Sequence, residues 1–263
     1  YDALSGLIAT QMGAKAVYLS GASLAYTRFG RSDIGLVSVS EVHDTLAAIA
    51  DRIETPVIVD ADNGFGNALN TQRTVRYFER AGAAAIQLED QSFPKRCGHL
   101  DGKKLISCGE MVGKVKAALD ARWNNDTLII ARTDAIATDG IDEALRRGER
   151  YMQAGADGLF VEAPTTIEDM RHICEELPVP QLANMIEGGV TPLLPPVELG
   201  EIGYSIASYG ITTLMLTART IRDTLADIKS GEFKLANTGL TFPEYLDIVD
   251  MPRWDSMEDR YKE

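Results

Sequence analysis

The sequence of 263 residues predicts an α/β fold, a (β/α)8 barrel, from three observations. Short apolar runs typical of strands alternate with helical stretches, which is the pattern of a parallel sheet. Polar and acidic residues recur directly after these runs, and in a barrel the carboxyl ends of all strands meet at one mouth. No Gly-rich dinucleotide fingerprint follows an early strand, which counts against the alternative of an open doubly wound sheet.

The predicted elements follow one another in a regular helix-then-strand order. The first helix is expected over Ala3 to Met12, ending at Gly13, a residue that suits a helix C-terminus. The later helices of the repeat are expected over 40–53, 68–81, 108–121, 141–154, 167–176 and 196–199. The strands are expected over 16–20, 57–59, 85–88, 128–131, 158–161, 181–184 and 204–207.

The two ends of the chain complete this prediction. The sequence starts at Tyr1 without an initiator methionine, and we expect a truncated first strand upstream of it to close the barrel. After the last strand come a long helix, Ile211 to Ile228, and a polar, aromatic tail over 231–263, expected to form an oligomer contact or an outer layer. Residues 1–263 are therefore predicted to form a single barrel domain, since such barrels commonly reach this size as one unit.

Composition excludes several classes of function. The net charge of -13 and the lack of a basic stripe argue against a nucleic-acid partner. No run of about 18 apolar residues is present, so no membrane association is expected. Cys97, Cys108 and Cys174 are odd in number and unpatterned, which predicts neither a disulfide framework nor a zinc site. A reducing, cytoplasmic compartment fits this composition.

Carboxylates cluster directly after two predicted strands. Asp60 and Asp62 follow the run 57–59, and Glu89 and Asp90 follow the run 85–88. Carboxylates at the ends of buried strands repel one another and resist loss of solvent, and a divalent cation with oxygen ligands offsets both effects. Helix caps and turns are the alternative, because both favour Asp. Recurrence at equivalent strand ends favours the metal site.

A long insertion over 91–106 follows the second acidic pair and contains Lys95-Arg96-Cys97-Gly98-His99. A polar, glycine-hinged loop of this length in a barrel is usually a functional lid. Cationic neighbours lower the pKa of a thiol, so Cys97 suits proton transfer. The alternative is an ordinary surface loop whose cysteine has no role.

Five short motifs, in order along the chain, together resemble the isocitrate lyase/phosphoenolpyruvate mutase superfamily. The resemblance covers essentially the whole chain. The motifs are Asp60-Ala61-Asp62 with Gly64-Phe65-Gly66, then Glu89-Asp90-Gln91, Lys95-Arg96-Cys97-Gly98-His99, Ala131-Arg132-Thr133-Asp134-Ala135 and Asn184-Met185-Ile186-Glu187-Gly188-Gly189.

The resemblance implies a metal, a substrate class and an assembly. It implies an Mg2+ ion, or Mn2+ in its place, held by Asp60, Asp62, Glu89 and Asp33. It implies a small dicarboxylate or tricarboxylate substrate and a homotetramer in which the last helix of each barrel is swapped between subunits. The implied substrate-binding residues are Ser20, Gly21, Ala22, Asp60, Arg132, Glu162 and Asn184. Of these, the predicted turn Ser20-Gly21-Ala22 is expected to form a backbone cradle for one substrate carboxylate.

The lid motif is similar to that of the carbon–carbon lyases of the superfamily, and Cys97 counts against the phosphonate-forming mutases. The resemblance therefore implies retro-aldol cleavage of a 2-hydroxy dicarboxylate of the alkylmalate or methylisocitrate type. Cys97 is expected to be the general acid and Tyr18 the proton acceptor. Lys95, Arg96 and His99 of the lid complete the predicted catalytic set. Such lyases are expected to have a proline or serine near the end of the last strand, where this sequence has Gly210, so the substrate's second substituent stays open.

Other functions remain alternatives at this stage. Oxaloacetate hydrolysis or decarboxylation could use the same metal and Arg132. A reaction like that of carboxyphosphonoenolpyruvate phosphonomutase is a further candidate within the superfamily. A barrel without catalysis, retained for binding or assembly, is the alternative from a different class of function.

Overall fold

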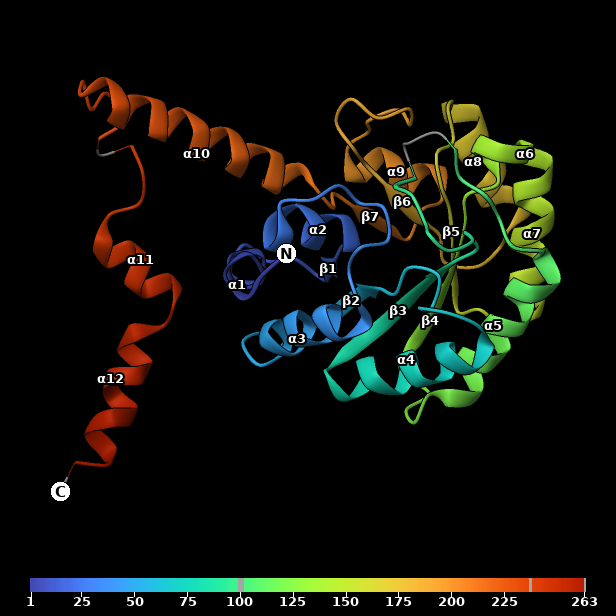
Figure 1. The fold of residues 1–263 in the computed structure, drawn as a ribbon, viewed down its shortest axis with the longest axis horizontal. Helices are drawn as coiled ribbons and strands as arrows, with labels where there is room; N and C mark the ends of the chain where they lie inside the picture. Colours follow the sequence, from blue (N-terminus) through green and yellow to red (C-terminus); the bar gives the residue numbers. More distant parts are fainter. Residues whose placement is uncertain (99–101, 237, 263) are drawn as a thin grey trace.

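The protein, seen in a computed structural model that describes residues 1–98, 102–236 and 238–262, is built from parallel strands with helices on their outer side (Figure 1). The strands in these ranges are β1 (Val17–Leu19), β2 (Val57–Asp60), β3 (Ala83–Glu89), β4 (Leu128–Thr133), β5 (Gly158–Val161), β6 (Leu182–Asn184) and β7 (Ile206–Ser208). The helices are α1 (Ala3–Gln11), α2 (Gly21–Phe29), α3 (Val39–Ala50), α4 (Ala68–Arg80), α5 (Cys108–Ala121), α6 (Ile136–Asp139), α7 (Ile141–Gln153), α8 (Ile167–Glu176), α9 (Pro196–Ile202), α10 (Thr212–Ser230), α11 (Phe242–Ile248) and α12 (Met251–Arg260).

The strands follow one another in chain order around the barrel. Strands β1 to β5 form one parallel sheet, and β6 pairs with β7. A parallel bridge between Leu159 and Gln181 connects β5 to the second pair. On the other side, Ser23 Oγ of α2 donates to the carbonyl of Gly210 at 2.9 Å, which brings the end of β7 beside the end of β1. The barrel and its parallel order were predicted correctly.

Side chains inside the barrel form an apolar layer with a polar layer above it. A strand alternates its faces, so the residue two positions beyond an inward side chain also points inward. The apolar layer, one packed cluster with a member from every described strand, consists of Tyr18, Ile58, Ala85, Ile130, Phe160, Leu182 and Ile206. Two positions further along each strand lie Ser20, Asp60, Gln87, Arg132, Glu162, Asn184 and Ser208, which we call the inner polar layer.

The intervening residues face outward and form the larger core. Val57, Val59, Ile86 and Leu88, for example, pack with helix residues in one buried cluster. Apart from Thr133 at the end of β4, the outward-facing residues of the strands are apolar, and the inner faces are polar only near their carboxyl ends. This arrangement places the functional groups at one end of a stable barrel, as is usual for the fold.

Element boundaries differ from the predictions in two instructive places. Helix α2 was not predicted, since Gly21 and Ala22 were assigned to a turn; Ser20 caps this helix by accepting a hydrogen bond from the N–H of Ser23 at 3.3 Å. The last strand runs over Ile206–Ser208, not over 204–207. This shift adds Ser208 to the inward-facing positions.

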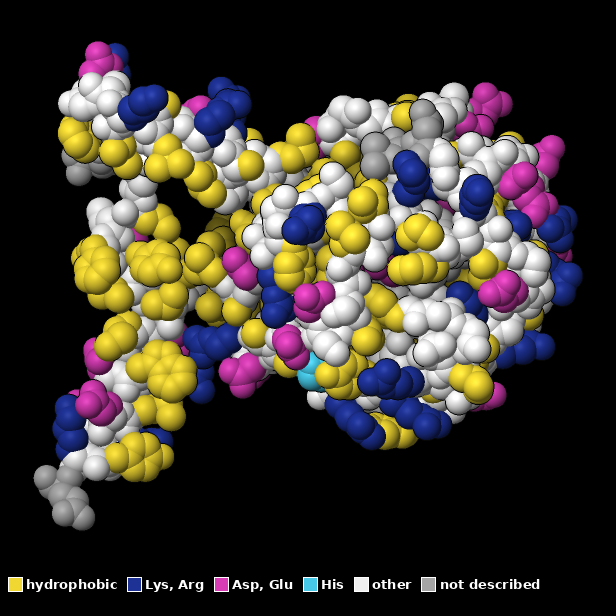
Figure 2. Space-filling model, in the orientation of Figure 1, with side chains coloured by type: hydrophobic (Ala, Val, Ile, Leu, Met, Phe, Trp, Pro, Cys, Tyr) yellow, Lys and Arg dark blue, Asp and Glu magenta, His cyan; other side chains and the backbone are white. Residues whose placement is uncertain are grey.

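The C-terminal helices extend away from the barrel (Figure 1). Helix α10 has no buried residue, and Leu216, Ile221 and Leu225 are between 56% and 60% exposed. Figure 2 shows apolar side chains over this arm and over the tail that follows it. The tail meets the barrel side through Gln11, whose Nε2 donates to the carbonyl of Ile248 at 3.1 Å. In this structure the tail leaves Leu216, Ile221 and Leu225 of α10 exposed. Among the described helices, none is both long and apolar enough for a membrane span.

Candidate active site

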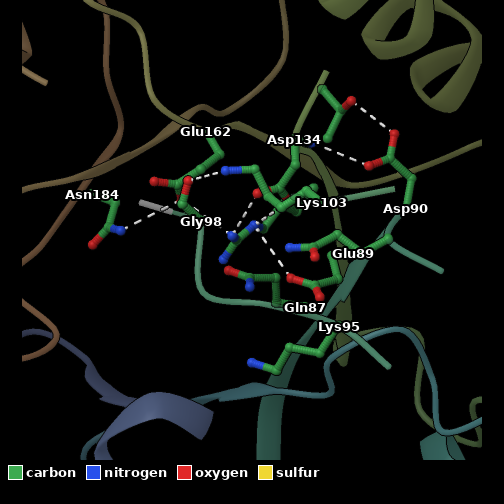
Figure 3. Close-up of polar contacts among 12 residues, drawn as sticks. Gln87, Glu89, Asp90, Lys95, Gly98, Lys103, Asp134, Glu162 and Asn184 are labelled. Atoms are coloured by element: carbon green, nitrogen blue, oxygen red, sulfur yellow. Dashed lines mark hydrogen bonds and ion pairs between the residues drawn. The ribbon is translucent and has the colours of Figure 1, made fainter. Parts of the chain in front are cut away.

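A pocket of about 580 Å³, counting its open mouth, lies at the carboxyl ends of the strands. Most of the inner polar layer lines it, together with residues of the loop after β3 and of the segment after β7. Figure 3 shows Glu89, Glu162 and Asn184 around the same space, with Gly98 of the loop beside them. Most of the predicted site residues therefore come together at one mouth.

Asp60 and Asp62 approach the start of α2 closely. Asp60 Oδ1 accepts from the N–H of Asp62 at 3.0 Å, and its Oδ2 accepts from the N–H of Gly21 at 3.2 Å. A Cβ at Gly21 would lie 3.2 Å from an oxygen of each carboxylate. Glycine therefore permits this approach. The predicted backbone cradle is altered here, because Asp60 already occupies the N–H of Gly21, whereas Ser20 and Ala22 line the pocket.

Lys95 places a positive charge between two buried acids. Its Nζ lies 2.6 Å from Asp33 Oδ1 and 2.7 Å from Asp62 Oδ1. Burial alone would lower the pKa of Lys95, but the surrounding carboxylates, Asp62 and Glu89 foremost, outweigh burial and raise that pKa well above its usual value. Lys95 thus partly compensates the negative charge at this end of the barrel.

The acids still remain under-compensated. Burial raises the pKa of Asp62 to about 6, against the opposing effect of Lys95. Burial also raises the pKa of Glu89 well above its usual value, although Arg132 and Lys95 oppose it. Within the described chain, Glu89 Oε1 is buried without a hydrogen-bond partner. This oxygen is a hard donor of the kind that Mg2+ prefers, but among the described residues no three acidic, histidine or cysteine side chains are already arranged around a metal site.

Arg132 of β4 lies beside Glu89 of β3 and is held in one orientation. Its guanidinium donates from Nε and Nη2 to the two oxygens of Asp134, each at 2.9 Å, and lies 4.9 Å from the centre of the Phe160 ring. Glu89 and Glu162 lie 3.5 Å and 3.6 Å from it. An arginine has five N–H donors, so the three that do not contact Asp134 can still bind a substrate carboxylate.

Asp90 does not belong to the cluster in which the sequence placed it. It follows the inward-facing Glu89 by one position and therefore points outward. Its Oδ2 accepts from Thr133 at 2.7 Å, Tyr151 at 2.8 Å and Arg147 at 3.0 Å, and its Oδ1 accepts from the N–H of Asp134 at 3.1 Å. Asp90 supports the backbone behind Arg132, and Asp33, from a different segment, joins the acids instead.

Tyr18 is held as a neutral phenol in this structure. Its hydroxyl donates to Gln87 Oε1 at 2.9 Å. Burial, and secondarily the charge of Asp60, raise the pKa of Tyr18 well above its usual value. These surroundings oppose the phenolate that a proton acceptor requires.

The loop after β3 lies over the pocket. Gln91 holds its start, because the side chain of Gln91 exchanges two hydrogen bonds, of 2.8 and 2.9 Å, with the backbone of Arg96. The N–H of Cys97 donates to the carbonyl of Asp33 at 3.2 Å, and Cys97 lines the pocket. Lys103 donates to the carbonyl of Gly98.

Gly98 lies against the substrate-binding wall. A Cβ there would lie 2.5 Å from Arg132 Nη2 and 2.8 Å from Glu162. Arg96 is exposed and does not line the pocket, so the structure does not bring it into the predicted catalytic set. His99 falls outside the described residues.

Three contributors were not predicted as site residues: Gln87, Asp134 and Ser208. Gln87 and Ser208 are the strand positions that the alternation rule assigns to the inner polar layer, so counting by two along β3 and β7 would have found them. The Asp134 side chain was part of a motif, but its bidentate contact with Arg132 depends on a turn after β4 that no local pattern indicates.

Comparison with known proteins gives this site a context. The family model described as phosphoenolpyruvate phosphomutase matches residues 1–229. The chain is 43% identical to a 2,3-dimethylmalate lyase of Eubacterium barkeri, over 99% of this chain and 91% of that protein. It is 42% identical to a 2-methylisocitrate lyase of Aeropyrum pernix, over 95% of this chain and 80% of that protein.

Solved structures agree with these relatives. A 2,3-dimethylmalate lyase described as a PEP mutase/isocitrate lyase superfamily member matches with a TM-score of 0.94 and 31% identity, over 99% of this chain and 88% of that one. An oxaloacetate acetylhydrolase in complex with the inhibitor 3,3-difluorooxalacetate matches with a TM-score of 0.92 and 32% identity, over 98% of this chain and 88% of that one. A phosphonopyruvate hydrolase in complex with oxalate and Mg++ matches with a TM-score of 0.87 and 28% identity, over 99% of this chain and 91% of that one. This chain belongs to the phosphoenolpyruvate phosphomutase family, within the PEP mutase/isocitrate lyase superfamily.

Proposed function

We propose that this protein is a Mg2+-dependent carbon–carbon lyase that cleaves a 2-hydroxy dicarboxylate of the alkylmalate or methylisocitrate type. The observation that supports this most is that under-compensated acids and a fixed arginine lie together at one mouth of the barrel. Asp62 and Glu89 have raised pKa values, and Arg132, 3.5 Å from Glu89, is held by Asp134. Cys97 of the covering loop lines the same pocket. The two most similar relatives described above are named as lyases of this kind.

The cation would be held by Asp60, Asp62 and Glu89, with Asp33 nearby. When bound, it supplies positive charge that stabilises the 2-oxygen of the substrate as the carbonyl product forms. The related phosphonopyruvate hydrolase, whose structure includes Mg++, supports the choice of ion.

The remaining roles follow from the chain's own groups. Arg132 binds the far carboxylate of the substrate, and Asp134 keeps the guanidinium in the orientation for a bidentate contact. The 2-hydroxyl proton would pass to Tyr18 after the phenol has released its own proton to solvent, because only the phenolate can accept one. A divalent charge at Asp60 would offset one of the causes that raise the Tyr18 pKa, so we assign this role to Tyr18 only in the metal-loaded protein.

Cleavage then breaks the C2–C3 bond. Its electron pair is stabilised by the adjacent carboxylate, and C2 becomes the carbonyl carbon of a 2-oxo acid. The Cys97 thiol gives its proton to C3. The loop over 91–98 excludes water from this step, because Gly98 rests on Arg132 and Glu162. A reduced thiol is needed for this role, which is why we also propose a cytoplasmic location.

A second candidate is oxaloacetate hydrolysis at the same site. The structural similarity to an oxaloacetate acetylhydrolase supports this candidate. Purified protein with Mg2+ should be assayed against 2,3-dimethylmalate, 2-methylisocitrate, oxaloacetate and phosphonopyruvate, with EDTA as the matched control. Release of a 2-oxo acid from either of the first two supports the lyase; turnover of oxaloacetate alone supports the hydrolase.

We also propose that α10 packs on a neighbouring barrel in a homotetramer with swapped helices. Its exposed Ile221, Leu225 and Ile228 support this, because spacings of four and three residues place them on one face of the helix, and an exposed apolar face is usually covered by a partner. Light scattering should give a tetramer for the wild type, and Leu225→Lys should dissociate it. The charge-matched control is Thr220→Lys on the same helix. A wild-type monomer at micromolar concentration rules out the swapped assembly.

A further inference from the structure

The loop between β2 and α4 has an unusual backbone conformation. Asp62 and Phe65 have positive φ angles of 46° and 58°, and Gly64 between them has a φ of 83°. Residues that carry a Cβ rarely adopt this left-handed region, so the conformation persists only where surrounding contacts fix it. Because Asp62 is one of the acids at the mouth, the contacts that hold this loop also determine where its carboxylate lies.

Backbone groups hold the first part of the loop. The carbonyl of Ala61 accepts from the N–H of Gly64 at 2.8 Å. The carbonyl of Asp62 accepts from the N–H of Glu89, at the end of β3, also at 2.8 Å. These two contacts join the loop to itself and to the neighbouring strand, and neither depends on a helix side chain.

Side chains of two helices hold the second part of the loop. Thr74 Oγ1 of α4 donates to the carbonyl of Gly64 at 3.2 Å. Lys114 Nζ of α5 donates to the carbonyl of Asn63 at 2.9 Å. The two helices pack side by side on the outer side of the barrel (Figure 1). Lys114 therefore fixes, from α5, the residue that directly follows Asp62.

Lys114 is a buried lysine without an ion pair. It is only 3% exposed, and among the described residues its hydrogen bond goes to the carbonyl of Asn63 and to no carboxylate. Burial lowers the pKa of Lys114, and the charges of Glu110 and Glu89 oppose this effect. Lysines are almost never buried to this extent unless they are paired, so the contact with Asn63 indicates a specific role.

We infer that Lys114 is a positioning residue, which holds Asn63 and thereby keeps the carboxylate of Asp62 at the mouth of the barrel. The inference rests on the proposed function, because it takes Asp62 as a ligand of the cation. Lys114 does not line the pocket, so it acts through the backbone of the loop. Without this donor the carbonyl of Asn63 would be buried and unpaired, and the left-handed conformation of Asp62 would lose its support on that side.

Hydrogen exchange of the metal-free protein, followed by mass spectrometry of peptides, tests the positioning without the cation. Lys114→Met has a side chain of similar length and no donor. We expect its amides over 61–66 to exchange at least tenfold faster than in the wild type, whereas those over 158–161 in β5 stay within about twofold. Lys116→Met, at an exposed lysine of the same helix, is the matched control.

Calorimetric titration with Mg2+ measures the consequence for the site. We expect Lys114→Met to bind Mg2+ at least tenfold more weakly than the wild type, and Lys116→Met to bind it with wild-type affinity. Lys114→Gln keeps a donor on a side chain one atom shorter, so its affinity and its exchange rates should lie between those of the wild type and Lys114→Met. Lys114→Gln carries the test if Lys114→Met does not fold.

Unchanged exchange over 61–66, or unchanged Mg2+ affinity, in Lys114→Met overturns the inference and leaves the proposed function intact. Equal acceleration over 61–66 and 158–161 also overturns it, because a general loss of stability then explains the result. An equal effect of Lys116→Met does the same. Failure of the wild type to bind Mg2+ contradicts the proposed function instead, and the exchange rates alone then decide whether Lys114 positions the loop.

Discussion

The carboxylate of Asp134 accepts two parallel hydrogen bonds from the guanidinium of Arg132, each 2.9 Å long. The backbone N–H of Asp134 in turn donates to Asp90, which Arg147 and Tyr151 hold from α7. Arg132 is therefore oriented from behind by a buried network, and its remaining donors are available at the pocket.

Asp134→Asn should loosen the orientation of the Arg132 guanidinium without disturbing the rest of the fold. An amide offers only one acceptor oxygen, so the fork loses one of its two contacts. We expect kcat/KM for the dicarboxylate substrate to fall about 10- to 100-fold, mainly through KM. Steady-state kinetics of the variant and of the exposed control Asp126→Asn provide the measurement. An unchanged KM in Asp134→Asn contradicts the positioning role.

Gly98→Ala should prevent the loop after β3 from packing against Arg132 and Glu162. The added Cβ would lie 2.5 Å from Arg132 Nη2, closer than two atoms can pack. We expect kcat to fall at least tenfold, while Mg2+ affinity measured by calorimetry stays within about twofold. Gly109→Ala is the control, because nothing lies within 4 Å of a Cβ at that helical position. Full activity in Gly98→Ala shows that the loop does not close in this way.

Alternation of apolar and polar residues explains why so much of this arrangement was predictable. Residues such as Asp60, Arg132 and Glu162 follow inward-facing apolar positions by two, so local sequence locates them at the mouth. Asp90 was wrongly assigned to the acidic cluster, because the prediction did not consider that neighbouring residues of a strand point to opposite faces. Helix α2 was missed because its first residues, Gly21 and Ala22, are also typical of a turn.

Contacts between distant segments could not be predicted in the same way. Lys95 reaches Asp33 and Asp62 through the path of a long loop, and the direction of such a loop is not encoded by local pattern. The pairing of Tyr18 with Gln87 likewise depends on how two strands face each other inside the barrel.

Thiol reactivity should single out Cys97. Cys108 is buried, and burial raises the pKa of Cys174 to about 11, which leaves little of the reactive thiolate at pH 8. We expect iodoacetamide to modify Cys97 at least tenfold faster than either, as followed by peptide mass spectrometry, and Mg2+ with malate to slow that reaction. Equal rates at Cys97 and Cys174 contradict this assignment of the accessible thiol.

Acid stability should depend on Glu143 of α7. Hydrogen bonds from Arg146 foremost, and from Arg147, lower the pKa of Glu143 from 4.5 to about 2, against the smaller effect of burial. A depressed carboxyl pKa stabilises the fold above the unfolded value, and the contribution is lost as pH falls from about 4.5 toward 2.

Glu143→Gln should therefore lower the free energy of unfolding by about 0.5–1 kcal/mol at pH 7 and by less at pH 3.5. Urea unfolding at the two pH values measures this difference. Glu149→Gln, at an exposed position on the same helix, is the control. A difference that is the same at both pH values means that the arginine pair does not set this carboxyl's pKa.

The most direct test of the account is the reaction in D2O with Mg2+, followed by NMR, for the wild type and Cys97→Ala. We predict that the wild type cleaves a 2-hydroxy dicarboxylate to a 2-oxo acid and a second carboxylic acid with one deuterium at the former C3. Cys97→Ala should lose at least 100-fold in rate while still binding Mg2+ and malate. Full activity of Cys97→Ala, or no cleavage of any substrate in the panel by the wild type, contradicts the account.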